Sequence, residues 1–382
     1  MYIKNLIRKT LIALIIIVGY MIQMQVQAQE LPDRENILQT MKKVNDYFMA
    51  KYSDCTEPSH VGITRPSNIW TRGVYYEGLM ALHQIYPEEK YYQYALDWAE
   101  FHRWGLRNGN TTRDADDQCC GQTYIDLYNM APNPERILNI KITMNRLIHT
   151  PQIDDWSWID AIQMGMPVLA KLGELTNDKR YFEKMYQMYA FTRNNHGVKG
   201  LYNPAEGLWW RDADFLPPYK EPNGKNCYWS RGNGWVYAAL VRVLDIIPTD
   251  EIHRKEYIAD FVSMSEALKK CQRTDGFWNV SLHDPTHFGG KETTGTSLFV
   301  YGLAYGINNG LLNRETYLPV LLNAWHALEK DAVHANGFLG WVQGTGKEPK
   351  DSQPVAYDKV PNFEDFGVGC FLLGASEIYK LH

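Results

Sequence analysis

Acidic, aromatic and basic side chains gather in six short stretches of this sequence, each directly ahead of an apolar run. Carboxylates exchange protons, arginines pair with anions, and flat aromatic faces stack on sugar rings. Together these residue types suit chemistry on acidic sugars. The six stretches are Trp70–Gly73, Asp116–Gly121, Trp156–Asp160, Trp229–Trp235, Glu292–Gly295 and Glu364–Gly367.

The carboxylates in these stretches have two interpretations each. Ser157 and Asp160 have the S-x-x-D spacing of a capping box, so Asp160 could cap a helix instead of exchanging protons. Spacing alone weights these two roles equally. Asp116 and Asp117 could be charges that the helix dipole favours at a helix N-terminus, and taken on its own this interpretation is slightly preferred.

The apolar runs alternate with six amphipathic, more charged segments. The runs are buried-helix patterns, whereas the segments show one buried stripe at helical spacing. This alternation predicts an all-α fold, an (α/α)6 barrel of six helical hairpins with the apolar helices inside. An open solenoid is disfavoured because the repeats are irregularly spaced. The runs are roughly 74–82, 122–128, 161–172, 236–247, 296–307 and 368–379, and the segments roughly 35–52, 89–104, 133–149, 178–194, 250–273 and 314–330.

All six chemistry-bearing stretches precede an inner helix, so they are expected at one end of the ring. The insert 195–228, rich in Gly, Pro, Asn and Asp, is too long for a plain connection. Loops of this length are usually functional. Aromatic walls, carboxylates and arginines are therefore expected around one concave mouth.

The first 28 residues resemble a secretory signal peptide. Lys4, Arg8 and Lys9 precede an apolar run over 11–21, and Ala28 ends a plausible cleavage site. An uncleaved anchor is the alternative, but the run is short for a membrane span. We expect a periplasmic or secreted protein with a single catalytic domain over 29–382 and no membrane association after cleavage.

The composition narrows the class of protein further. With 39 basic and 44 acidic residues, the net charge is −5. The sequence has no basic run, so binding to nucleic acid is disfavoured. Six cysteines lack zinc-site spacing; we expect most to be buried thiols, with a bridge permitted but unassignable. No nucleotide, acyl-transfer or zincin motif is present. We expect no metal or cofactor, and a monomer or weak dimer.

Two motifs carry a family resemblance. Trp156–Leu172 resembles the catalytic-helix motif of unsaturated glucuronyl and rhamnogalacturonyl hydrolases, glycoside hydrolase families 88 and 105, the second being closer. Trp229–Trp235 resembles their Trp-x-Arg-Gly-Asn-Gly-Trp motif, and the likeness runs from about residue 65 to the C-terminus. The family fold is the (α/α)6 barrel, which agrees with the helix pattern.

The resemblance implies a reaction at the C4=C5 double bond that lyases leave on a terminal uronate. A carboxylic acid protonates C4 and helps water add at C5; the resulting hemiketal opens and releases the neighbouring sugar. Asp160 matches this acid/base. A second acid is assigned to Asp117, with Asp116 the close alternative. Burial against Trp156 and Trp158, with Asp117 nearby, is expected to raise the pKa of Asp160.

The same resemblance implies the residues that bind the unsaturated sugar. Arg211 stands where some relatives carry His, which leaves substrate choice open. Arg231 and Trp235 could alternatively form a structural cation–π pair. The expected substrate-binding residues are Trp229, Arg231, Trp235, Arg211, Asp116, Trp156 and Asn233.

The expected function is therefore an exported hydrolase of unsaturated uronyl oligosaccharides. Rhamnogalacturonan fragments are the first choice of substrate, and unsaturated glucuronyl-rhamnose from ulvan-like polymers stays open. One alternative is another (α/α)6 enzyme on uronates, either a lyase or an ordinary glycosidase. The other is a non-catalytic sugar-binding protein that keeps the aromatic mouth.

Overall fold

The computed structural model describes residues 31–61, 63–359 and 365–382, and residues 34–382 form one compact unit. The expected signal peptide and Glu364 lie outside the described residues. Within the described part, no helix is both long and apolar enough to span a membrane.

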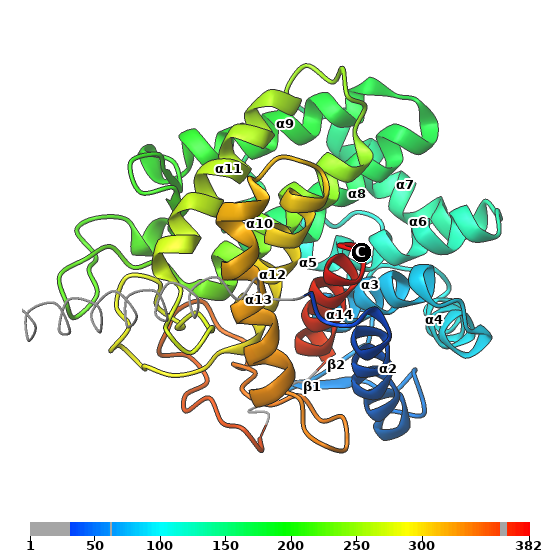
Figure 1. Cartoon of the computed structure of the whole chain (residues 1–382). Coiled ribbons are helices and arrows are strands. Elements are labelled where there is room, and N and C mark those ends of the chain that lie inside the picture. The colour runs from blue at the N-terminus through cyan, green and yellow to red at the C-terminus, as the bar shows by residue number, and fades with distance from the viewer. Residues whose placement is uncertain (1–30, 62, 360–364) are drawn as a thin grey trace, which may run out of the picture. The chain divides into compact units, whose positions relative to one another are not determined.

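Six helices form a closed inner ring (Figure 1). Each packs against the next, and the last packs against the first, so the ring has no open edge. Most side chains on these helices are buried all round, as their apolar sequences require. The inner helices are α3 (Trp70–Ile85), α6 (Cys120–Met130), α8 (Asp160–Thr176), α10 (Ser230–Ile246), α12 (Thr293–Asn308) and α14 (Asp365–Tyr379).

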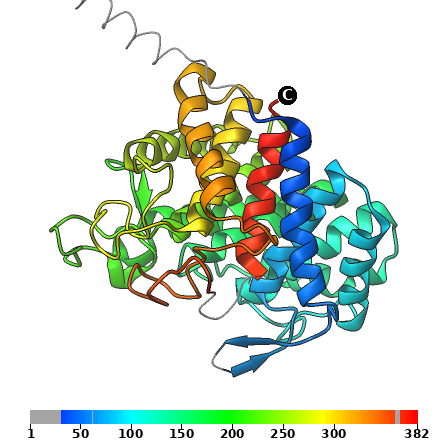
Figure 2. The ribbon, with the colours of Figure 1, turned by 60° about the horizontal axis from the view of Figure 1, so that its bottom comes forward.

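Six amphipathic helices cover the ring from outside, one against each inner helix. Figure 2 shows one such pair, α2 beside α14. The predicted (α/α)6 barrel is confirmed, with both sets of helices where the hydrophobic pattern placed them. The outer helices are α2 (Arg34–Lys51), α4 (Glu89–Phe101), α7 (Glu135–Ile148), α9 (Lys179–Asn194), α11 (Arg254–Cys271) and α13 (Arg314–Asp331).

The connections differ sharply between the two ends of the barrel. Links from an inner helix to its outer partner are short, such as 86–88 and 177–178. Links into the next inner helix are long, and those at 195–229 and 332–364 are the longest. The N-terminal ends of the inner helices therefore carry most of the irregular chain, as predicted for the mouth.

These long links contain the small elements of the fold. The ribbon β1 (Ser59–Val61) with β2 (Ile63–Arg65) is antiparallel, as is β3 (Tyr202–Asn203) with β4 (Leu208–Trp209). The helix α5 (Ala115–Gln118) and the 3-10 turns η1 (His196–Val198) and η2 (Ala213–Phe215) complete them. All six cysteines are free thiols, so the permitted bridge does not form.

The first and last inner helices meet through glycines. A Cβ added to Gly369 would lie 2.2 Å from the carbonyl oxygen of Val74, and one added to Gly78 would lie 2.6 Å from that of Gly369. Both clashes are with backbone, which cannot rotate away. The ring closes at this seam because neither helix carries a side chain there.

We expect Gly369→Ala to lower the free energy of unfolding by about 3 kcal/mol, since overpacking here must push α3 and α14 apart. Urea denaturation followed by circular dichroism measures it. Gly290→Ala is the matched control, because a Cβ at Gly290 meets no atom within 4 Å. Equal stability of the two variants would contradict the argument that α3 and α14 pack together only because Gly369 has no side chain.

Candidate active site

A pocket of about 160 Å³ opens at the N-terminal ends of the inner helices. It combines two carboxyl groups, two guanidinium groups and four indole rings. Residues from four separate sequence stretches and from two of the long links meet in it, as the barrel topology predicted. Its lining is Trp70, Asp116, Trp158, Asp160, Met164, Arg211, Trp229, Arg231, Trp235, Thr345 and Gly346.

Asp160 is the first residue of α8 and is almost completely buried. Its Oδ2 accepts hydrogen bonds from Nε and Nη2 of Arg211, at 3.3 and 3.2 Å. Its Oδ1 is buried with no hydrogen-bond partner. The N-cap residue before α8 is Ile159, and no side chain caps the helix, so the capping-box interpretation of Asp160 does not hold.

The long insert 195–228 places Arg211 beside this carboxyl group. The backbone N–H of Ile159 donates to the carbonyl oxygen of Arg211 at 2.9 Å, and Trp158 pairs with Asp212 in an isolated antiparallel bridge. Arg211 Nη1 also donates to Asp212 Oδ2 at 2.7 Å. Two backbone segments far apart in the sequence therefore fix Arg211 beside Asp160.

Arg231 is fully buried at the start of α10 and held by backbone carbonyls. Its Nη1 donates to the oxygen of Gln343 at 2.7 Å, and its Nη2 to that of Gly344 at 2.6 Å. The guanidinium carbon lies 4.5 Å from the ring centroid of Trp229 and 5.0 Å from that of Phe366. The expected aromatic partner of Arg231 was Trp235; the structure gives this role to Trp229 and Phe366.

Gln343 ties this arrangement to the last long link. Its Oε1 accepts from Trp229 Nε1 at 2.9 Å, and its Nε2 donates to the backbone oxygen of Asp351 at 2.8 Å. Trp229 therefore has a fixed ring plane, and the segment that carries Thr345 and Gly346 is held against the pocket. A single amide orients both the aromatic wall and its covering loop.

Burial in the pocket favours the protonated form of both of its carboxyl groups. Burial raises the pKa of Asp160, while Arg211 and Arg231 oppose this and Asp212 adds to it. Burial also raises the pKa of Asp116 to about 7, with the charges of Asp114 and Asp160 contributing. The predicted rise in the pKa of Asp160 is confirmed in direction, but the like charge that contributes to it is Asp212 and not Asp117.

Asp117 faces away from this pocket. Its carboxylate is fully buried and accepts from Arg107 Nε at 2.5 Å, Asn108 Nδ2 at 2.8 Å and Thr112 Oγ1 at 2.7 Å. Asp116, one residue earlier on α5, lines the pocket. The structure therefore places Asp116, the alternative, in the pocket, whereas the carboxylate of Asp117, the preferred residue, anchors the link before α5.

Two other residues expected to bind substrate lie behind the pocket. Trp156 is buried against α8, where a Cβ on Gly165 would approach its Nε1 to 3.0 Å. Asn233 is occupied by backbone: its Oδ1 accepts from the N–H of Trp209 at 2.8 Å, and its Nδ2 donates to two carbonyls at 3.0 Å. Asn233 therefore fixes β4 to α10, and neither side chain lines the pocket.

The pocket also contains residues that the sequence did not single out as ligands. Trp70 and Trp158 belong to the first and third stretches, so their positions in the sequence already indicated that they lie at the mouth of the barrel. Met164 follows Asp160 by one helical turn, a spacing that would have indicated it. Thr345 and Gly346 come from an irregular link without a motif. Across the described residues, no three His, Cys, Asp or Glu side chains cluster as a metal site would require.

The two neighbouring aspartates should respond differently to amidation. Asp117→Asn should lower the free energy of unfolding by about 3 kcal/mol, because it breaks a buried ion pair. Asp116→Asn should stabilise the fold, by an amount that grows from about pH 4 to about pH 7 and then levels off. A carboxyl group whose pKa is raised on folding makes the folded protein less stable as the pH rises from the ordinary pKa of the group to its raised pKa. Replacing Asp116 by a neutral amide removes this loss.

Thermal unfolding of both variants and the wild type between pH 4 and pH 8 measures this difference. Asp250→Asn, at an exposed position, is the control and should track the wild type. An Asp116→Asn variant whose melting temperature differs from the wild type by the same amount at every pH would contradict the buried-acid argument.

Comparisons with known proteins identify the family of this chain. The model of Glycosyl Hydrolase Family 88 matches residues 40–382. An "Unsaturated 3S-rhamnoglycuronyl hydrolase" of Formosa agariphila is 33% identical over 333 residues, 82% of this chain and 84% of the relative.

Two solved structures have nearly the same fold. A glycosyl hydrolase family 88 protein from Bacteroides vulgatus is 33% identical, with a TM-score of 0.83 over 92% of this chain and 100% of the other. A structure named as a polysaccharide lyase is 32% identical, with a TM-score of 0.82 over 91% and 97%. The match over almost the whole barrel confirms the resemblance: the chain belongs to glycosyl hydrolase family 88.

Proposed function

We propose that this glycoside hydrolase hydrates the C4=C5 double bond of an unsaturated uronic acid at the non-reducing end of an oligosaccharide. The observation that carries the proposal is the carboxyl group of Asp160. It lies buried in a small aromatic pocket, with one oxygen unpartnered and two guanidinium groups near it. A group in this state is suited to give up a proton to carbon.

Asp160 acts first as an acid and then as a base. It protonates C4 of the enol ether, and the cation that develops at C5 is attacked by water, whose proton returns to Asp160. The hemiketal formed at C5 opens, and the neighbouring sugar leaves. Asp160 ends as it began, so the cycle needs no other proton source.

The two arginines supply the anion site. The substrate carboxylate can take a two-pronged hydrogen bond from Arg211, whose Nε and Nη2 now face Asp160. As Arg211 turns to the substrate, Asp160 loses a neighbouring donor that favours its ionised form. Substrate binding therefore raises the pKa of Asp160 further and prepares it as an acid.

We assign the second acid to Asp116 in place of Asp117. Asp116 lines the pocket and interacts with Asp160 through its charge, whereas Asp117 is saturated by three donors. With a pKa near 7, Asp116 can hold or release a proton in neutral solution and so orient the attacking water. Trp158 and Trp229 provide the faces for the sugar ring.

For the substrate, we favour an unsaturated glucuronyl residue linked to rhamnose over a rhamnogalacturonan fragment. The 33% identical relative carries a rhamnoglycuronyl name, which supports the alternative that the sequence had left open. The pocket volume of about 160 Å³ suits one terminal ring. A lyase acting within a polymer would need an open groove.

The test follows the ultraviolet absorbance of the conjugated double bond. With unsaturated glucuronyl-rhamnose, the wild type should remove this absorbance, and Asp160→Asn should lower kcat by about 10³-fold, because the amide cannot supply the proton. Asp250→Asn is the control and should keep full activity. The sulfated and unsulfated disaccharides and a rhamnogalacturonan disaccharide rank the substrates.

The sign of the absorbance change separates the alternatives. A lyase creates the chromophore, so absorbance that rises on an intact uronate polymer would replace our proposal with the lyase suggested by one structural relative's name. Binding of the disaccharides without any change would favour the sugar-binding protein.

We further propose that the chain is exported and cleaved after Ala28. Produced in a double-membrane bacterium, the protein should be recovered from the periplasm or medium with Gln29 at its N-terminus. Intact-mass measurement tests this, and deletion of residues 11–21 is the control that should trap the chain in the cytoplasm. A chain that keeps Met1 and sediments with membranes would show an anchor instead.

A further inference from the structure

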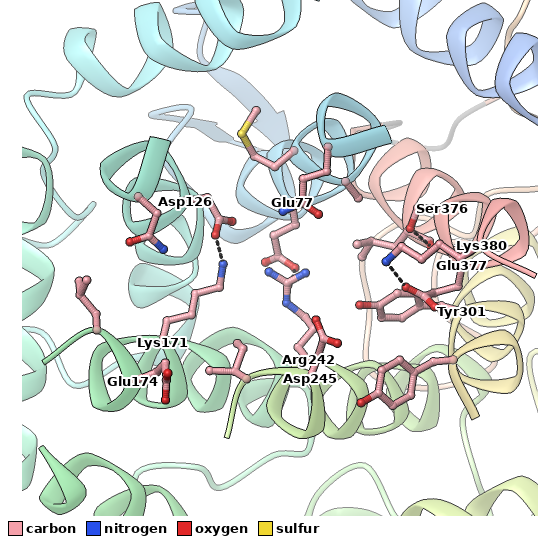
Figure 3. A pocket seen from close by; sticks show the side chains of 18 residues that line it. Glu77, Asp126, Lys171, Glu174, Arg242, Asp245, Tyr301, Ser376, Glu377 and Lys380 are labelled. Atoms are coloured by element: carbon pink, nitrogen blue, oxygen red, sulfur yellow. Dashed lines mark hydrogen bonds and ion pairs between the residues drawn. The ribbon is translucent and has the colours of Figure 1, made fainter. Parts of the chain in front are cut away.

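A second cavity opens at the opposite end of the barrel, where the inner helices end. Its volume is about 570 Å³, within the range of small-molecule sites and larger than the pocket around Asp160. All six inner helices contribute to its wall, so it lies on the barrel axis (Figure 3). No residue of the Asp160 pocket lines it.

Paired charges form the deep part of this cavity. Arg242 Nε donates to Gln122 Oε1 at 2.8 Å and lies 3.6 Å from Glu77 Oε2, and Lys171 pairs with Asp126. Burial raises the pKa of Glu77 and lowers that of Lys171. Apolar residues would fill a barrel lumen at lower cost than buried charges, so packing alone does not explain this lining.

Several polar groups in the cavity have no partner among the described residues. Tyr301 is 7% exposed, and its side chain makes no hydrogen bond and extends from α12 toward Arg242 (Figure 3). The Nη1 and Nη2 atoms of Arg242 also make none, since only its Nε is bonded. At the rim, the carboxylates of Glu174 and Asp245 form no ion pair.

The Nη atoms of Arg242, the hydroxyl of Tyr301 and the two rim carboxylates define the chemistry of an occupant. Arg242 offers donors, Glu174 and Asp245 offer acceptors, and the hydroxyl of Tyr301 can serve as either. A cation would leave Arg242 unsatisfied. An anion would meet the two rim carboxylates, whose charge remains after the three ion pairs of Glu77, Asp126 and Glu377 cancel.

We propose that this cavity is a second saccharide site, which takes a neutral mono- or disaccharide. Sugar hydroxyls both donate and accept, so they satisfy Arg242, Tyr301 and the rim acids at once, and the rings of Tyr301 and Tyr305 give an apolar face. The site excludes uronates, whereas the Asp160 pocket selects them. The proposal is independent of the reaction proposed above.

The experiment measures binding of L-rhamnose and D-glucose to the full chain by titration calorimetry and saturation-transfer NMR, with D-glucuronate as the charged probe. A neutral sugar should bind, and Tyr301→Phe should weaken it about 5- to 10-fold by removing one hydrogen bond. Tyr47→Phe, on an outer helix, is the matched control. Ala81→Trp, which fills the cavity from its half-buried rim, should abolish binding.

Trp158→Ala separates the two sites, because Trp158 lines the Asp160 pocket and not the second cavity. Neutral-sugar binding that survives Trp158→Ala and is lost in Ala81→Trp supports the second site. The proposal is overturned if neither sugar binds, or if binding is lost in Trp158→Ala and kept in Tyr301→Phe and Ala81→Trp. Binding of D-glucuronate or of calcium chloride that Ala81→Trp removes would also overturn it. Circular dichroism confirms that each variant is folded.

Discussion

Backbone contact between α3 and α14, at Gly78 and Gly369, is the constraint on which the other features depend. The inner helices are apolar nearly all round, so each must be covered by two neighbours and an outer partner. A ring satisfies this for all six only if its first and last members touch. Closure also brings Trp70, on the first inner helix, into the same pocket as Trp235, on the fourth, at 6.1 Å between ring centroids.

A closed ring of hairpins places every inner helix in the same direction, and this sets where chemistry can occur. Short links at one end leave the lumen open there, whereas long links at the other end fold over the helix N-termini. The helix dipoles add partial positive charge at that end, which suits a pocket for an anionic sugar. Asp160 and Arg231 both lie in the first turn of an inner helix, so rigid elements hold them.

The charged groups in the lumen are buried, and burial disfavours a charge that has no partner, so these groups are paired or have shifted pKa values. Around Asp160, burial outweighs two arginines and leaves the acid able to keep its proton. At the other end, Glu77 and Lys171 are held by partners, and their pKa values still shift toward the neutral forms. Burial thus has the same effect at both ends of the barrel: it favours the neutral forms of Asp160 at the mouth and of Glu77 and Lys171 in the second cavity.

Periodicity by itself determined the barrel, because helices buried all round and helices with one apolar stripe have distinct patterns that tertiary contacts only complete. It also determined that the stretches around Asp160 and Trp229 share one end. Only the tertiary structure decided which side chains enter the pocket. Asp116 and Asp117 are adjacent, yet Asp117 is paired with Arg107 outside the pocket. Asn233 is bound by one backbone N–H and two backbone carbonyls. Those partners lie in irregular links, whose paths depend on long-range hydrogen bonds that no local pattern records.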